Sequence, residues 1–144
     1  MGDVAALGLL KMDFLGLTNL TILGTAVDVI KTLRGVDVAL AKIPDGDEKT
    51  YAMLAEGETF GVFQLESAGM RRYVQELKPE SISDLAAMVA LYRPGPMQHI
   101  PTYIRAKHGL EEIRHPHPDL AELLGETYGV IVYQDQVLLI AQKF

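Results

Sequence analysis

Cysteine and tryptophan are absent from the 144 residues, and long apolar runs are absent as well. Without cysteine the chain can form neither a disulfide framework nor a thiolate metal site. No apolar run approaches the roughly 20 residues that a membrane span needs, and no secretory signal pattern stands at the start. We therefore expect a cytoplasmic protein that crosses no membrane.

Basic residues are fewer than acidic ones, 13 against 19, which gives a formal net charge of −6. A surface that binds the phosphates of DNA needs clustered lysine and arginine. The basic residues here form only local groups, at Arg71-Arg72, at residues 105–108 and at Arg114-His115. This chain by itself is not predicted to be an electrostatic clamp, and a parent that holds DNA would carry most of its positive groove elsewhere.

The apolar pattern predicts a mainly α fold with short β pieces. Leu23, Val27 and Ile30 recur at helical spacing, so we expect a helix that Thr18 or Asn19 caps and that runs to about Arg34. Further helices are expected after the N-cap residues Asp47, Ser67 and Ser81 or Ser83, over residues 98–108 and 119–124, and from Gln134 onward.

Two stretches favour strands. The pattern predicts a short buried strand at Val130–Val132 and a longer strand over residues 7–15. On that longer strand Lys11 and Asp13 would share one face, beside apolar neighbours. Buried charges are costly unless they are paired or bind a metal. From this stretch alone, a structural ion pair, or an aspartate that reaches water at the strand end, is the favoured interpretation.

Arginines provide the other candidates for chemistry. Arg93 precedes a proline-fixed bend and could present its guanidinium to phosphate or tie the loop to backbone carbonyls. Residues 63–67 precede a helix whose N–H groups could hold an anion, or they simply cap it. Arg71 and Arg72 fit a solvated helix face, with contact to a DNA backbone as the minority interpretation. His115 and His117 alternate with prolines, which favours a linker over a zinc site.

Five collinear strings carry a family resemblance. The segment Lys11–Leu17, with the Thr-Asn-Leu-Thr-Ile-Leu that follows it, resembles part of the alpha subunit of bacterial DNA polymerase III, a C-family replicative polymerase. The other four strings are Val62–Met70, Val89–Pro96, Arg105–Gly109 and Thr127–Gln136.

The resemblance implies roles for named residues. Asp13 would match the last of three palm-domain carboxylates that hold Mg²⁺ for nucleotidyl transfer, with Lys11 as its basic neighbour. Primer–template DNA and a deoxynucleoside triphosphate would be the partners, and other replisome subunits would bind through regions not present here. The residues expected to contact nucleotide or DNA are Arg93, Gln64, Ser67, Arg71 and Arg72.

The resemblance also implies a domain organisation. Residues 1–17 would form the last palm strand, and residues 18–144 the first part of a multi-helix fingers domain, truncated at Phe144. We expect such a fragment to be inactive alone. The alternative is a non-catalytic helical module that binds protein or nucleic acid, which would have no reason to place Lys11 and Asp13 together on a strand.

Overall fold

The structure, a computed structural model, describes residues 4, 6–10 and 12–144. The chain divides into two compact units, Met1–Ile43 and Pro44–Phe144, each of which is described by itself. Within the described residues, no helix is both long enough and apolar enough to cross a membrane.

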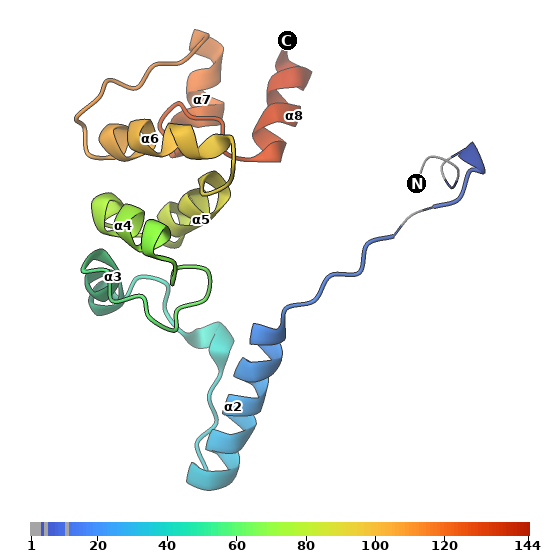
Figure 1. The fold of residues 1–144 in the computed structure, drawn as a ribbon, viewed down its shortest axis with the longest axis vertical. Coiled ribbons are helices and arrows are strands. Elements are labelled where there is room, and N and C mark those ends of the chain that lie inside the picture. The colour runs from blue at the N-terminus through green and yellow to red at the C-terminus, as the bar shows by residue number, and fades with distance from the viewer. Residues whose placement is uncertain (1–3, 5, 11) are drawn as a thin grey trace. The chain divides into compact units, whose positions relative to one another are not determined.

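The first unit is built on one long helix. An extended segment leads into α2, Thr18–Arg34, which ends at Gly35 in the left-handed conformation, and a 3₁₀ turn follows at Leu40–Lys42 (Figure 1). The predicted bounds of this helix are confirmed. Its N-cap differs, because the cap position is Leu17, which provides no side-chain hydrogen bond. No side chain of α2 is buried.

The predicted strand over residues 7–15 is wrong. Leu7 and Gly8 lie in a turn, and the described residues from Leu9 to Leu17 have no regular secondary structure. A strand requires a hydrogen-bonded neighbour, and no other described segment is paired with this one. Alternating polarity marks which side chains would share a face, but it does not supply the partner. Lys11 lies outside the described residues.

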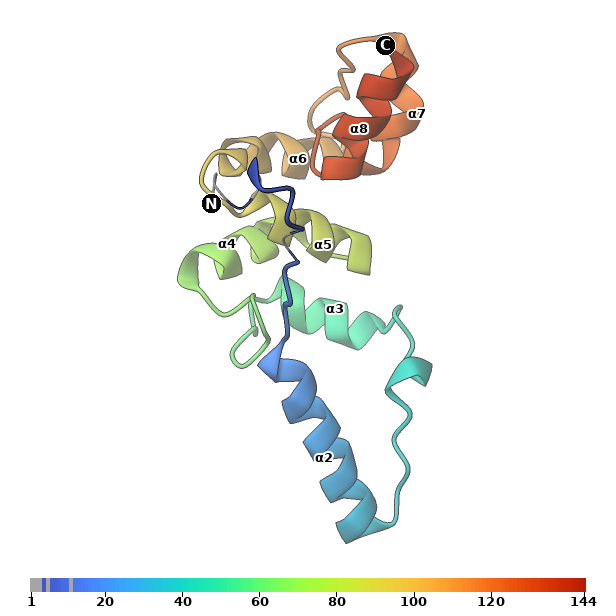
Figure 2. The same ribbon diagram turned by 90° about the vertical axis from the view of Figure 1, so that its right-hand side faces the viewer.

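The second unit contains six α-helices among the described residues. They are α3 Glu48–Ala55, α4 Ala68–Leu77, α5 Ile82–Leu91, α6 Ile100–Lys107, α7 Ala121–Leu124 and α8 Gln134–Lys143. Short 3₁₀ turns lie at Pro96–His99, Pro118–Leu120 and Gly125–Thr127. Helices α3 and α4 lie side by side, as do α7 and α8 (Figures 1 and 2).

Three of these helices begin at side-chain caps that the sequence predicted. Asp47 accepts a hydrogen bond from the N–H of Lys49, Ser67 from that of Met70, and Ser81 from that of Asp84, all at 3.2 Å. Each cap satisfies one N–H that would otherwise lack a partner in the first helical turn. At the other end of α4, Lys78 takes the left-handed conformation before Pro79.

The core of the second unit lies where α4, α5 and α6 meet. Val74, Leu77, Met88, Leu91 and Ile100 are fully buried there. Burial of each such side chain contributes about 1.5–3 kcal/mol. In α5 itself, Met88 and Leu91 are buried, whereas Leu85 and Val89 are partly exposed.

A buried ion pair links three helices of this core. The ammonium of Lys107, at the end of α6, lies 3.5 Å from the carboxylate of Asp84 in α5. It also donates to the Lys78 carbonyl that follows α4, at 3.3 Å. The same ammonium pairs with the exposed carboxylate of Glu80 at 3.3 Å. The side chains of Lys107 and Asp84 are only 6% and 8% exposed, so the Asp84 charge depends on Lys107 for compensation.

The predicted buried strand at Val130–Val132 is also wrong. The side-chain oxygen of Gln136 accepts the N–H groups of Val132 and Tyr133, at 2.8 and 3.0 Å. The N–H of Val130 donates to the carbonyl of Thr127. The donors that a neighbouring strand would use are therefore satisfied locally, by a turn and by a buried glutamine of α8. Among the described residues, all regular secondary structure is helical, and there is no sheet.

Candidate functional site

An open groove of about 480 Å³ lies on the second unit between a loop and one face of α5. The loop contributes Val62, Phe63, Gln64 and Leu65. The helix contributes Ile82, Leu85, Ala86, Val89 and Ala90, a spacing that follows a single helical face. Because α5 is apolar on this side as well as toward the core, burial of one face leaves a second apolar face as the groove wall.

Two predicted site residues meet at this groove. Gln64 lines it from the loop, and Arg93, just beyond the end of α5, lines it from the helix side. Gln64 has a φ of 65°, a conformation that a residue other than glycine rarely adopts. Arg93 is exposed, and none of the ion pairs among the described residues involves it. The groove therefore carries an amide and an uncompensated guanidinium.

The position of Arg93 is fixed through the residue before it. The ring of Tyr92 packs edge-on against Tyr73 of α4, with centroids 6.0 Å apart. Its hydroxyl lies in the space that a Cβ on Gly69 would occupy, so a larger residue there would displace the Tyr92 ring. After Arg93 the chain turns tightly, and the N–H of Met97 donates to the Arg93 carbonyl at 3.1 Å.

The other three predicted contact residues do not line the groove. Ser67 caps α4 through its hydroxyl. Arg72 pairs with Glu76 at 3.2 Å, and its guanidinium lies 5.3 Å from the ring centre of Tyr73. Arg71 donates to the Glu66 carbonyl at 3.4 Å, while its buried Nε has no hydrogen-bond partner in the described structure. The local partners of Arg72 leave it less available to a ligand than Arg93.

Asp13 lies in the first unit, in the extended segment before α2, and is exposed. Magnesium in proteins takes several oxygen ligands, usually more than one carboxylate. The described residues contain no group of three or more histidine, aspartate or glutamate side chains placed to hold a metal ion. Asp13 alone therefore does not make a complete metal site.

The histidine pair His115 and His117 follows the linker interpretation at one position. His117 accepts the N–H of Asp119 at 3.2 Å and so caps a 3₁₀ turn.

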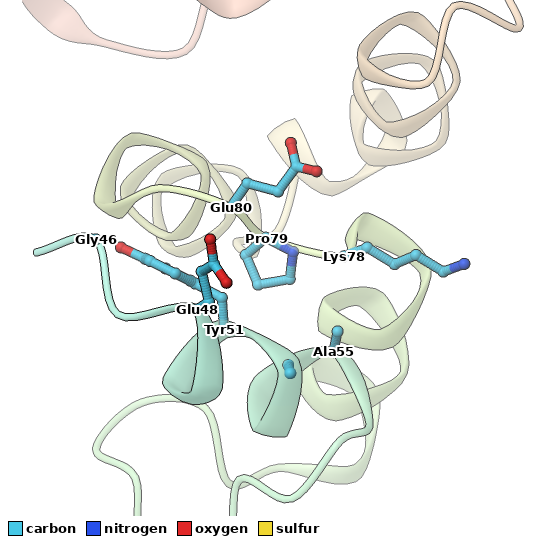
Figure 3. Close-up of a pocket in the computed structure, with 8 residues that line it drawn as sticks. Gly46, Glu48, Tyr51, Ala55, Lys78, Pro79 and Glu80 are labelled. Carbon is cyan, nitrogen blue, oxygen red and sulfur yellow. The ribbon is translucent and has the colours of Figure 1, made fainter.

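A second cavity, of about 310 Å³, lies between α3 and the connection from α4 to α5 (Figure 3). It is lined by Glu48, Tyr51, Lys78 and Glu80, among others. The Lys78 ammonium points away from the two carboxylates in this view. Burial, with the nearby charges of Asp45 and Asp84, raises the pKa of Tyr51, whose hydroxyl donates to the Asp45 carbonyl. None of the predicted site residues lines this cavity.

Sequence reasoning missed the wall of the groove. Phe63 and the outward face of α5 complete it, and neither is among the residues expected to contact nucleotide or DNA. The available signal was the composition of α5, Ile-Ser-Asp-Leu-Ala-Ala-Met-Val-Ala-Leu, in which apolar residues exceed what one buried face requires.

The geometry defines a helical domain with an apolar groove that ends at an arginine. Comparison with known proteins gives its family: residues 19–144 match the family model described as the bacterial DNA polymerase III alpha subunit finger domain. The chain belongs to this family, as the resemblance in the sequence predicted.

Relatives agree with this assignment. DNA polymerase III subunit alpha of Halalkalibacterium halodurans is 53% identical over 143 residues, which is 99% of this chain and 13% of that protein. The subunits of Bacillus subtilis and Thermus aquaticus are 48% and 52% identical, each over 99% of this chain and over 13% and 12% of their own length. The chain thus spans about an eighth of the relatives' length.

Proposed function

We propose that this chain supplies the finger segment of a DNA-directed DNA polymerase, with the groove of the second unit as a contact for nucleic acid or nucleotide. The observation that carries the proposal is the meeting of Gln64 and Arg93 at one groove in a member of this family. A guanidinium presents a fork of N–H donors that matches phosphate oxygens, and here no carboxylate in the described structure neutralises it. Ser67, Arg71 and Arg72 would be secondary contacts beside it.

We further propose that residues 1–17 belong to the palm and that Asp13 is one of several carboxylates that hold Mg²⁺ in the whole polymerase. The metal would lower the energy of charge that develops during nucleotidyl transfer. Lys11 would be the basic neighbour of Asp13. Deoxynucleoside triphosphate and primer–template DNA are the proposed substrates, in the cytoplasm, and the described part of this chain does not complete the metal site by itself.

The test uses a chimera in which this chain replaces the matching segment of the Bacillus subtilis subunit, to which it is 48% identical. Arg93→Ala should raise the KM for nucleotide or DNA by about tenfold or more, because a charge-assisted hydrogen bond contributes about 1.5–3 kcal/mol. Lys49→Ala removes one exposed cation from α3 and is the charge-matched control, which should leave the KM unchanged.

Equal effects of the two variants would contradict the proposed role of Arg93. A chimera that is folded and binds DNA, but extends no primer, would instead favour the non-catalytic binding module.

A further inference from the structure

The side chains that line the groove limit the kind of ligand that it can bind. Its lining consists of apolar side chains, one amide and one cation, and it contains no acid. Its volume of about 480 Å³ falls in the about 300–1,000 Å³ range of sites for small organic groups. A ligand that matches this lining combines a flat apolar body with one negative charge.

The loop that forms one wall holds exposed aromatic rings in a fixed backbone. The hydroxyl of Thr59, which is fully buried, donates to the Leu65 carbonyl at 2.7 Å and closes the loop. Two successive turns lie inside it, because Val62 donates to the Thr59 carbonyl and Leu65 to the Val62 carbonyl. Phe60 is 93% exposed and Phe63 is 45% exposed. The loop therefore presents two rings to solvent at little further cost in conformational entropy.

The charge of the site favours a ligand with a single phosphate over a triphosphate. Arg93 is the sole cation among the lining residues. Arg71 and Arg72 do not line it: Arg71 donates to the Glu66 carbonyl, and Arg72 is paired with Glu76. The loop itself carries Glu58 and Glu66, which do not line the groove but would repel a polyanion. One guanidinium matches the one phosphate per nucleotide of a strand, and it falls short of the several cations that a triphosphate requires.

We propose that the groove binds one unpaired nucleotide of single-stranded DNA. The base packs against Phe63, the amide of Gln64 hydrogen-bonds the base edge, and Arg93 pairs with the phosphate. Phe60 stacks on the adjacent base, as aromatic residues do for successive bases in single-strand-binding proteins. This inference rests on the proposed function and specifies the nucleic acid that the site takes.

The test measures binding of the 144-residue chain to a single-stranded oligonucleotide that carries one 2-aminopurine, at low salt. Stacking quenches the fluorescence of this base. Phe63→Ala and Phe60→Ala should each weaken binding by about 5- to 150-fold, and Phe63→Ala should also reduce the quench. Leu110→Ala is the matched control, because Leu110 is 76% exposed on the same unit and does not line the groove. Circular dichroism checks that every variant keeps its helix content.

Salt dependence separates the two halves of the site. Arg93→Ala should lower the slope of log K against log salt by about 0.7, the loss of one phosphate contact, while Phe63→Ala should leave the slope unchanged. Phe63→Trp, which retains a stacking surface, should restore binding.

Each other outcome has a definite meaning. If only Arg93→Ala weakens binding, the stacking proposal is overturned and the proposed function stands. If the chain binds no single strand, or if neither arginine nor phenylalanine variants differ from Leu110→Ala, both are overturned. If a deoxynucleoside triphosphate displaces the strand, and its log K falls with log salt several times more steeply than that of the strand, the groove is a triphosphate site. The single-strand proposal then fails.

Discussion

The two units of this chain use the same kind of amphipathic helix with opposite results. In the first unit, α2 carries an apolar stripe, yet none of its side chains is buried, and Leu33 is 74% exposed. In the second unit, α4 carries a more sharply defined apolar stripe, and Met70, Val74 and Leu77 are at most 2% exposed. Helical periodicity identifies the apolar face in both cases, but only the packing of a second element against that face decides whether it stabilises the fold.

The functional candidates divide in the same way. Asp13 lies in the first unit, whose described residues include no buried side chain, whereas Gln64 and Arg93 lie in the unit that has a buried core. A binding groove needs walls held at fixed distances, and the second unit provides them through α5 and a closed loop. The following predictions test this difference between the units, from the largest expected effect to the smallest.

The largest effect is expected at the buried ion pair. Lys107→Met leaves the 8% exposed carboxylate of Asp84 without its cation and should lower the free energy of unfolding by about 3–5 kcal/mol. Lys31→Met is the matched change in the first unit, where the pair with Asp37 is 61% and 79% exposed, and it should cost less than about 1 kcal/mol. Urea unfolding followed by circular dichroism measures both. Similar costs at the two sites would show that the interior pair is not isolated from solvent.

Core truncation gives the next comparison. Leu77→Ala removes a fully buried side chain and should cost about 2–5 kcal/mol, because a cavity remains where its methyl groups packed. Leu33→Ala in α2 should change the free energy of unfolding by no more than about 0.5 kcal/mol. A large loss for Leu33→Ala would mean that α2 is covered in solution by a surface that its exposure does not indicate.

Two helical glycines should respond to alanine with opposite signs. Gly24 of α2 has open space around it, so Gly24→Ala should stabilise the chain by up to about 1 kcal/mol. Gly69→Ala places a methyl group where the Tyr92 hydroxyl lies, and overpacking of about 1–3 kcal/mol should outweigh the helical gain. Stabilisation by both changes would contradict the close packing of Tyr92 on α4, and with it the fixed position of Arg93.

The smallest effect is expected in alkaline solution. Burial, with the nearby charge of Asp84, raises the pKa of Tyr103 well above its usual value near 10. As pH rises past 10 the unfolded chain loses this proton first, so the free energy of unfolding falls in that range. Tyr103→Phe should make the decline between about pH 9 and 11 shallower, as measured by urea unfolding at several pH values. If the free energy of unfolding declines equally in both proteins, groups other than Tyr103 cause the decline.

The sequence predicted helix bounds and caps, and it missed features that depend on which specific side chains meet. The bounds of α2 and the caps at Asp47, Ser67 and Ser81 follow from local chemistry, and they are confirmed. The predicted strand at Val130–Val132 is wrong because the Thr127 carbonyl accepts the N–H of Val130 and the Gln136 side chain accepts that of Val132. A periodicity of apolar residues carries no sign of these bonds. Arg93 and Gln64 were each candidates, but nothing in their separate motifs placed them at one groove.

The most direct test of the account compares Asp13→Ala with Arg93→Ala in the polymerase chimera, measuring primer extension and DNA binding on the same preparations. If the two units divide chemistry and binding as proposed, Asp13→Ala abolishes extension and leaves DNA affinity nearly intact. Arg93→Ala should instead weaken binding of DNA or nucleotide while some extension remains at saturating substrate. Loss of both activities, or of neither, in the Asp13→Ala chimera would contradict the account.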